Sequence, residues 1–468
     1  MGKVRRIFSK IYTKASSQST SYMPDAASLN PAPSESAIQT TKPLSTVDRP
    51  ETDPISDTAR SFVQRNTALE NLAAEICYAI LDALDYKSLR ALVHASPTFH
   101  QHYRMDRKFL LRGCLQRTLG AAAVDACAAY RSSPEFFTDE RTRESVAEFL
   151  KVYWERRSST TYSISDEALT EDEAAAIVAF HLTIIEPLSE CFTVRTLGIL
   201  ADETGGPPYH KPLSSTEEVR VIRAMYRFQL CCNLFHERRH QFMQPLDLGS
   251  IDVIKLYFCL FEPWEVEEVV CIYAFARDEF DRIFRDIHCD MSQENPRFAD
   301  QARPPTPNGA FNFDNAWERS NWLGGTVMCG FELLHTILFK MKDHNHLVTT
   351  MQKSISSGGE LFDGALSEGT QWARRDEQLS ERDLKQQARD PLPFVGDLEP
   401  DSHRSCPPLA WTLVWKGTYS NVYGDYLEDE MRRWGYVMWD AARLEEEGGK
   451  ALLLRQWGND WDPREMTF

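Results

Sequence analysis

The sequence lacks most of the short motifs that identify an enzyme or a metal site. None of its eleven cysteines forms a CxxC pair, which excludes the ligand spacing of zinc ribbons and thioredoxin-like redox sites. It contains no GxxxxGK[ST] phosphate loop, no GxGxxG dinucleotide fingerprint and no GxSxG nucleophile elbow. Alternating strand patterns are scarce, and no uninterrupted apolar run is long enough to cross a bilayer. We therefore expect no integral membrane segment, no cofactor and no catalysis.

Basic residues are also fewer than acidic ones. The formal net charge is −17 at pH 7, and nucleic-acid affinity comes largely from basic side chains that neutralise phosphates. Nucleic acid is therefore not an expected partner. The only charged residues before Asp25 are Lys3, Arg5, Arg6, Lys10 and Lys14. Apolar residues alternate with them, so three interpretations of this basic segment stay open: a solvated tail, a membrane-surface helix and a mitochondrial targeting sequence.

The cysteines indicate a reducing environment. Cys77, Cys231, Cys259 and Cys271 lie within apolar helical patterns, where a thiol usually acts as a small buried hydrophobe. No secretory signal precedes them. We therefore expect the protein in the cytoplasm, the nucleus or both.

Helical periodicity is the main signal that the sequence does contain. Residues 1–66 are rich in Ser, Thr, Pro and Ala, which predicts a disordered tail that begins with the basic segment. Beyond it, apolar residues recur at three- and four-residue spacings, so the fold class is all-α. A small helical motif is expected over 67–112 and a larger, irregular helical body over 113–468. Polar or proline-rich stretches near 291–312 and 354–408 predict flexible loops.

Two capping boxes and one long helix can be predicted within the body. Thr170 with Glu173, and Ser215 with Glu218, match the Ser/Thr-x-x-Glu pattern that satisfies the first amides of a helix. Near the C-terminus, residues 427–444 look like a single helix that ends before a glycine pair.

Residues 72–103 contain three short helical patterns. The first has apolar residues along one side of a helix, at Leu72, Ile76, Ile80, Leu81 and Leu84. Asn71 precedes it and can cap it. The second stripe consists of Leu89, Leu92 and Val93. The third begins at Ser96-Pro97, a capping residue followed by a proline at the first helical position, and its apolar side consists of Phe99, Tyr103 and Phe109. Three helices of this size bury little surface alone, so they need a partner or the rest of the chain.

This pattern resembles the F-box, the motif by which substrate receptors dock on the Skp-type adaptor of cullin-RING ubiquitin ligases. The correspondence runs without a gap from Leu72 to Phe99, where the family often has Trp. The family usually has Pro after the first Leu, and this chain has Ala73. Three segments also resemble F-box-like proteins of filamentous fungi that have no assigned substrate: residues 90–104, 261–271 and 427–444.

The resemblance implies a non-catalytic substrate receptor. Its partners would be a Skp-type adaptor and an unknown protein substrate, which the body at 113–468 would hold. The residues that the resemblance assigns to adaptor docking are Leu72, Ile76, Leu81, Leu84, Leu89, Leu92 and Phe99. The alternative is that the same helices pack entirely against the body and leave a vestigial F-box that binds no adaptor.

One motif points to a different chemistry. His236, Glu237 and His240 match HExxH, in which two histidines bind zinc and the glutamate acts as a general base. A zinc metallopeptidase is therefore a second alternative. Its third ligand would come from Glu262, Glu265, Glu267 or Glu268. Against it, the two arginines between the histidines would place positive charge beside the metal, and both histidines also continue a helical stripe. No metal ligand is assigned.

Two other groups of residues have simple structural interpretations. His344 and His346 beside Asp343 are more often an exposed polar turn than a metal site. Aromatic residues of the C-terminal block recur at helical spacings, so we interpret them as core: Trp411, Trp415, Trp434, Tyr436 and Trp439.

Overall fold

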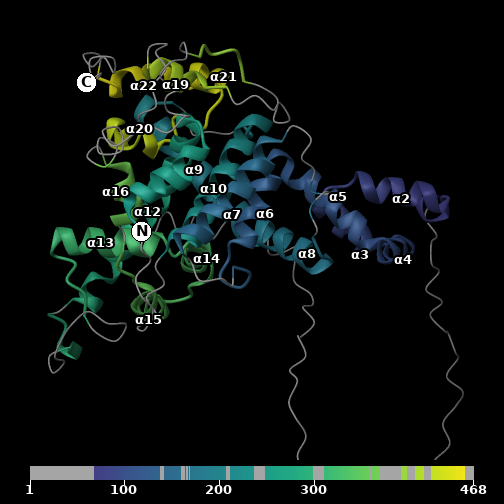
Figure 1. Ribbon diagram of the computed structural model, residues 1–468, viewed down its shortest axis with the longest axis horizontal. Coiled ribbons are helices and arrows are strands. Elements are labelled where there is room, and N and C mark those ends of the chain that lie inside the picture. Colours follow the sequence, from purple (N-terminus) through teal and green to yellow (C-terminus); the bar gives the residue numbers. More distant parts are fainter. Residues whose placement is uncertain are drawn as a thin grey trace, which may run out of the picture. The chain divides into compact units, whose positions relative to one another are not determined.

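The structure is a computed structural model of the chain (Figure 1). It describes residues 68–137, 142–159, 164, 167, 169–206, 211–236, 248–292, 294–298, 310–358, 360–367, 370, 392–397, 406–415 and 423–458. The described residues all belong to one compact unit within Arg65–Phe468. The predicted disordered tail, residues 1–66, lies outside the described residues.

The fold is all-α, as the sequence predicts. Within the described ranges there is no β-strand, and the one β feature is an isolated parallel bridge between Ser292 and Phe311. The N-terminal helices are α2 (Ala74–Ala83), α3 (Tyr86–Ala95), α4 (Pro97–Met105) and α5 (Arg107–Leu119). A 3₁₀ turn, Ala68–Asn71, precedes them.

The body contains the remaining α-helices of the described residues. They are α6 (Ala123–Arg131), α7 (Arg143–Ser158), α8 (Glu171–Phe180), α9 (Glu186–Thr204), α10 (Ser215–Phe235), α11 (Ser250–Asp252), α12 (Pro263–Met291), α13 (Ala316–Val327), α14 (Phe331–His335), α15 (His344–Ser354), α16 (Glu360–Leu366), α19 (Leu409–Val414), α20 (Asp429–Arg433), α21 (Ala441–Glu446) and α22 (Gly449–Gln456). Because α16 lies inside the loop predicted at 354–408, that prediction is wrong for this segment.

Helices α10 and α12 form the centre of the body and pack against each other (Figure 1). Helix α6 packs on α10, while α13 and α20 pack on α12. Both central helices are buried around most of their circumference, which is the pattern of a core helix rather than a surface one. Their buried positions include charged residues, so the centre of the body combines an apolar core with ion pairs.

Helices α8 and α9 form one continuous stretch, joined by a π turn at His181–Ile185. Pro187 lacks the amide that would bond the carbonyl four residues back, and the amide of Glu186 instead reaches the carbonyl of His181. The stretch Glu171–Thr204 is long and apolar enough to cross a membrane, but a core helix passes the same test. It packs against α5 and α10, so this one weak candidate is not evidence for an integral membrane protein.

Local capping explains several helix boundaries. Ser96 accepts a hydrogen bond from the amide of Phe99, with Pro97 in the first turn, as predicted. Thr170 and Glu173 form the predicted capping box of α8. The prediction for Asn71 is wrong, because Asn71 ends the 3₁₀ turn and a residue without a capping side chain, at position 73, precedes α2.

The second capping box is displaced by one residue from the prediction. Ser214 and Glu217 form it, not Ser215 and Glu218. Ser214 also donates to Asp440 of the C-terminal block, and this tertiary contact favours the earlier register.

The C-terminal block differs from its predicted single helix at 427–444. Helices α20 and α21 are short and flank a turn in which Gly435 has a φ of 69°, a value that favours glycine. The indole of Trp439 donates to the carbonyl of Trp434 at 2.7 Å and closes this turn. The aromatic residues predicted to be core are buried: Trp411, Trp415, Trp434, Tyr436 and Trp439.

Candidate functional site

Residues 68–119, here called the F-box-like unit, have a hydrophobic core of their own. Its buried members are Cys77, Leu81, Leu89, Val93, Phe99, Leu110 and Cys114. The half-buried residues packed around them are Ile80, Leu84, Tyr86, Leu92 and Tyr103. All four helices contribute, so each helix buries its apolar side against the others.

Polar contacts hold the helix ends of this unit together. The Ser96 hydroxyl donates to the Glu70 carboxylate at 2.6 Å, which ties the start of α4 to the 3₁₀ turn. The amide of Tyr86 donates to the Thr118 hydroxyl at 3.2 Å, which ties the start of α3 to the end of α5. Burial raises the pKa of the Cys114 thiol to about 11, so this side chain is neutral and packs as an apolar group.

Three of the seven predicted docking residues are not available to a partner. Leu81, Leu89 and Phe99 are buried in the core of the unit. Their assignment as direct adaptor contacts is therefore corrected. In this conformation they are core residues on which the exposed side chains of the unit pack. The reason is that a helical stripe contains both the core side and its exposed edge, and spacing alone does not separate them.

The other four predicted docking residues are at least partly accessible. Leu84 and Leu92 are half-buried against the core. Leu72 is 37% exposed and Ile76 is 49% exposed, which is unusual for large apolar side chains. These four are the predicted residues that a partner can contact.

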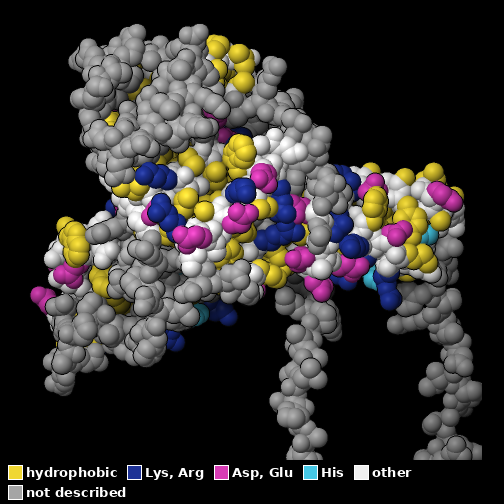
Figure 2. Space-filling view, viewed as in Figure 1, with side chains coloured by type: hydrophobic (Ala, Val, Ile, Leu, Met, Phe, Trp, Pro, Cys, Tyr) yellow, Lys and Arg dark blue, Asp and Glu magenta, His cyan; other side chains and the backbone are white. Residues whose placement is uncertain are grey.

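Leu69 of the 3₁₀ turn is also exposed, at 50%, and the extended backbone of Ala73 separates this turn from α2. Leu69, Leu72 and Ile76 are called the apolar row below. Leu69 could have been included from the sequence, because the apolar residues spaced by three and four begin at residue 69 rather than at residue 72. Figure 2 shows hydrophobic side chains among charged ones on the surface of this part of the chain.

Two exposed apolar residues lie near the junction of α4 and α5, and sequence reasoning missed both. Met105 ends α4 and Phe109 lies in the first turn of α5; both are more than half exposed. Phe109 was predicted to point inward, and that prediction is wrong. The next residues, Leu110 and Leu111, take the buried positions instead.

Helix α5 belongs to two hydrophobic cores. Leu110 and Cys114 complete the core of the F-box-like unit. Leu111 and Leu115 are also buried but lie on a neighbouring side, and α5 packs against α8 and α6 of the body. The domain boundary predicted at residue 112 therefore falls inside α5.

Two ion pairs also join the F-box-like unit to the body. Lys87 of α3 pairs with Glu186 of α9. Arg107 of α5 pairs with Glu171 of α8 at 3.4 Å. Such surface pairs contribute little stability each, so the packing of α5 is the main connection.

Ala73 is the residue at which the resemblance to the F-box would expect Pro. It lies just before α2 with a φ of −59° and a ψ of 147°. Proline fixes φ near −65°, so this backbone conformation suits proline. No described residue accepts a hydrogen bond from the Ala73 amide.

Comparison with known proteins yields no relative. No family model, curated protein or solved structure matches the chain. Function therefore has to be argued from the residues and their geometry.

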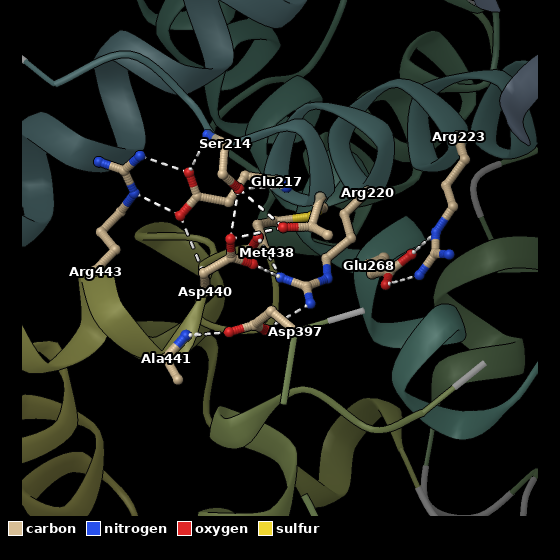
Figure 3. Close-up of polar contacts among 11 residues, drawn as sticks. Ser214, Glu217, Arg220, Arg223, Glu268, Asp397, Met438, Asp440, Ala441 and Arg443 are labelled. Atoms are coloured by element: carbon tan, nitrogen blue, oxygen red, sulfur yellow. Dashed lines mark hydrogen bonds and ion pairs between the residues drawn. The ribbon is translucent and has the colours of Figure 1, made fainter. Parts of the chain in front are cut away.

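A second polar cluster lies between α10 and the C-terminal block (Figure 3). Glu217 accepts from the Arg443 guanidinium at 2.5 Å and from the Asp440 amide at 3.0 Å. Arg220 donates to Asp440 at 2.7 Å and to Asp397 at 2.9 Å. Each of these carboxylates has a guanidinium or amide partner, so the cluster joins distant segments and offers no free general base.

The glutamates of α12 are also paired with arginines. Glu265 accepts from Arg157 at 2.6 Å and from Arg227 at 3.1 Å. Burial opposes ionisation of Glu265, but Arg157 and Arg227 outweigh it and hold the pKa well below its usual range. Glu265 is therefore an anion that is already neutralised.

Two other glutamates that were considered as third zinc ligands are also paired with arginines. Glu267 accepts from Arg432 at 3.0 Å, and Glu268 accepts from Arg223 at 2.7 Å. The fourth candidate, Glu262, takes part in the capping box that begins α12. All four glutamates are thus already engaged in ion pairs or helix capping.

Of the histidines considered for metal binding, the structure describes His236, His344 and His346, and none of these belongs to a group of metal ligands. His236 ends α10, with its Nε2 3.7 Å from the Cys329 sulfur, while residues 237–240 lie outside the described residues. His344 and His346 are exposed at the start of α15, where Asp343 caps the amide of His346. Within the part of the chain that the structure describes, no three His, Cys, Asp or Glu side chains form a metal site.

Proposed function

We propose that the chain is an F-box-like substrate receptor of a cullin-RING ubiquitin ligase. The F-box-like unit would dock on a Skp-type adaptor, and the helical body would bind a protein substrate. The chain itself would be non-catalytic, and its contribution would be to hold the substrate near the transfer machinery, which raises the effective concentration of the two.

The observation that carries this proposal is the exposed apolar row on a unit with its own core. Helices α2, α3 and α4 pack mainly on one another and on α5, and α5 makes the extensive contact with the body. The body therefore leaves Leu69, Leu72 and Ile76 exposed. This packing argues against the alternative in which the body covers the whole motif.

The size of the expected effect follows from burial. A fully buried Leu or Ile contributes about 1.5–3 kcal/mol relative to a fully exposed one. Leu72 and Ile76 are only partly exposed, so burying both at an interface contributes on the order of 2 kcal/mol, or more than tenfold in affinity. Placing a charge at either position removes this contribution and adds a desolvation cost.

The experiment measures binding of a purified Skp-type adaptor to the full chain by biolayer interferometry. The double variant Leu72→Asp/Ile76→Asp is expected to weaken binding more than tenfold without loss of helical content. Val194→Asp is the control, because Val194 is an apolar residue of α9 in the body that is 52% exposed. Absence of adaptor binding by the wild-type chain would overturn the proposal, as would equal binding by the double variant.

A further inference from the structure

An open pocket of about 440 Å³ lies where the F-box-like unit meets the body. It is lined by His100, Tyr103, Arg104, Arg107 and Glu171. The first three belong to α4, Arg107 begins α5 and Glu171 begins α8. Four of the five side chains are cations or hydrogen-bond donors, which is unusual in a chain of net charge −17.

The positive charge of this region is local. Residues 86–119 contain seven Lys and Arg but one acidic residue, Asp106. His100 and Arg104 are four residues apart on one side of α4, and Arg107, after the break at Asp106, lines the same pocket. Neither His100 nor Arg104 has an ion-pair partner within the described ranges.

Arg107 makes two polar contacts at the pocket. Its Nε donates to the Tyr103 hydroxyl at 3.4 Å, and its Nη1 faces the Glu171 carboxylate at 3.4 Å. The remaining N–H donors of its guanidinium can bind a ligand in the pocket.

The start of α5 adds unsatisfied donors beside Arg107. Its first turn has no acidic residue, and the Asp106 side chain makes no capping hydrogen bond. Among the described residues, no acceptor contacts the amides of Arg107, Lys108 and Phe109. These amides lie beside the basic side chains of Arg107 and Lys108, while the carboxylates of Asp106 and Glu171 offset part of the positive charge.

Glu171 determines which anion can bind. Its side chain is 41% exposed and can move into solvent, but it already neutralises part of the charge of Arg107. A ligand carboxylate would only replace one negative charge by another. A phosphate monoester carries nearly two charges and three acceptor oxygens at neutral pH, so it gains more from the same donors.

We propose that this pocket binds the phosphate group of a phosphorylated serine or threonine on a protein partner. Arg104, Arg107 and His100 would donate to the phosphate oxygens, and Glu171 would turn away from Arg107. The pocket is open and larger than a phosphate ion, so a peptide can lie across it beside the Tyr103 ring. This site is independent of the proposed adaptor docking.

The test uses the full chain and a fluorescein-labelled peptide, Gly-Ala-phosphoSer-Ala-Gly, in a polarisation assay. Wild type is expected to bind this peptide and not its unphosphorylated form. Arg104→Ala and His100→Gln are expected to weaken binding, together by at least tenfold. Glu171→Gln is expected to strengthen it several-fold, an effect that loss of folding cannot imitate.

Matched controls separate this site from general electrostatic attraction. Arg90→Ala removes an exposed arginine of α3 that does not line the pocket, and it should leave peptide affinity unchanged. Leu72→Asp/Ile76→Asp should also bind the peptide normally, which distinguishes failure of this proposal from failure of adaptor docking. Equal loss in Arg90→Ala and Arg104→Ala would overturn the proposal. So would binding of inorganic phosphate without binding of the phosphopeptide.

Discussion

The imidazole of His181 faces the hydroxyl of Tyr226, with 3.1 Å between Nδ1 and the phenolic oxygen. His181 lies in the π turn between α8 and α9, and Tyr226 lies in the middle of α10; both are buried. Burial lowers the pKa of His181 to about 4, although the carboxylate of Glu186 opposes the shift. A neutral imidazole is therefore part of the packing between these helices.

Acid should destabilise the protein through His181. As the pH falls from 6.5 towards 4, the unfolded chain gains a proton on this residue that the folded chain does not, so stability falls with pH. By pH 5 the loss is about 2 kcal/mol. Urea unfolding at pH 7 and pH 5 measures it, and His181→Gln should reduce the difference by that amount. His94→Gln, at an exposed position, is the control, and an equal reduction there would contradict the prediction.

Ala73→Pro should stabilise the F-box-like unit. The backbone at this position already suits proline and no described acceptor loses a hydrogen bond, so the gain comes from a less flexible unfolded chain, about 0.5 kcal/mol. The measurement is the midpoint of denaturant unfolding. Ala79→Pro, exposed but inside α2, should instead cost about 3 kcal/mol. A destabilised Ala73→Pro would show that the start of α2 needs the amide.

Leu81→Ala and Ile76→Ala should separate stability from binding. Leu81 is buried, so its truncation should cost about 2–5 kcal/mol of unfolding free energy. Ile76 is half exposed, so its truncation should change stability by less than about 1 kcal/mol but weaken the adaptor complex. Parallel denaturation and binding curves give both quantities. Equal destabilisation by the two variants would refute this division.

Removing one member of the buried pair Glu267–Arg432 should cost more than removing both. Both side chains are buried, and Arg432 also pairs with Asp429. Arg432→Met leaves a buried carboxylate uncompensated, a loss of about 3–5 kcal/mol. The double variant Arg432→Met/Glu267→Met should recover part of that loss. A double-mutant cycle by thermal unfolding tests this, and strictly additive losses would disprove the coupling.

Metal analysis of purified protein addresses the zinc peptidase alternative. The four glutamates considered as third ligands are engaged in ion pairs or capping, so we expect no stoichiometric zinc. His236→Ala should leave both metal content and stability nearly unchanged. About one zinc per chain, lost in His236→Ala, would restore the peptidase hypothesis.

Features fixed by neighbouring residues could be predicted from the sequence. The boundaries at Ser96 and Thr170 depend on a side chain and an amide three residues away, so they were predictable. The pair Ser214 and Ser215 shows where local reasoning ends. Both match the capping-box pattern, and contacts with Asp440, more than two hundred residues away, favour Ser214.

The sequence predicted which segment contains the candidate site, but not which of its side chains are exposed. Ile76 and Leu81 belong to one helical stripe, yet one is half exposed and the other is buried. Which edge of a stripe faces the core depends on how the four helices cross, and periodicity does not contain that information. Phe109 was misplaced for a related reason, because α5 is buried on two sides and its apolar residues have no single face.

The two cores that share α5 make this helix a rigid arm of about 20 Å, at 1.5 Å per residue over 13 residues. The F-box-like unit is therefore not a detachable module: a chain cut at residue 112 would open both cores at once. If a substrate is held by the body, its direction and distance from the ligase machinery would be set by the length and rotation of α5. Inserting one residue into α5 would rotate one partner by about 100° about the helix axis relative to the other.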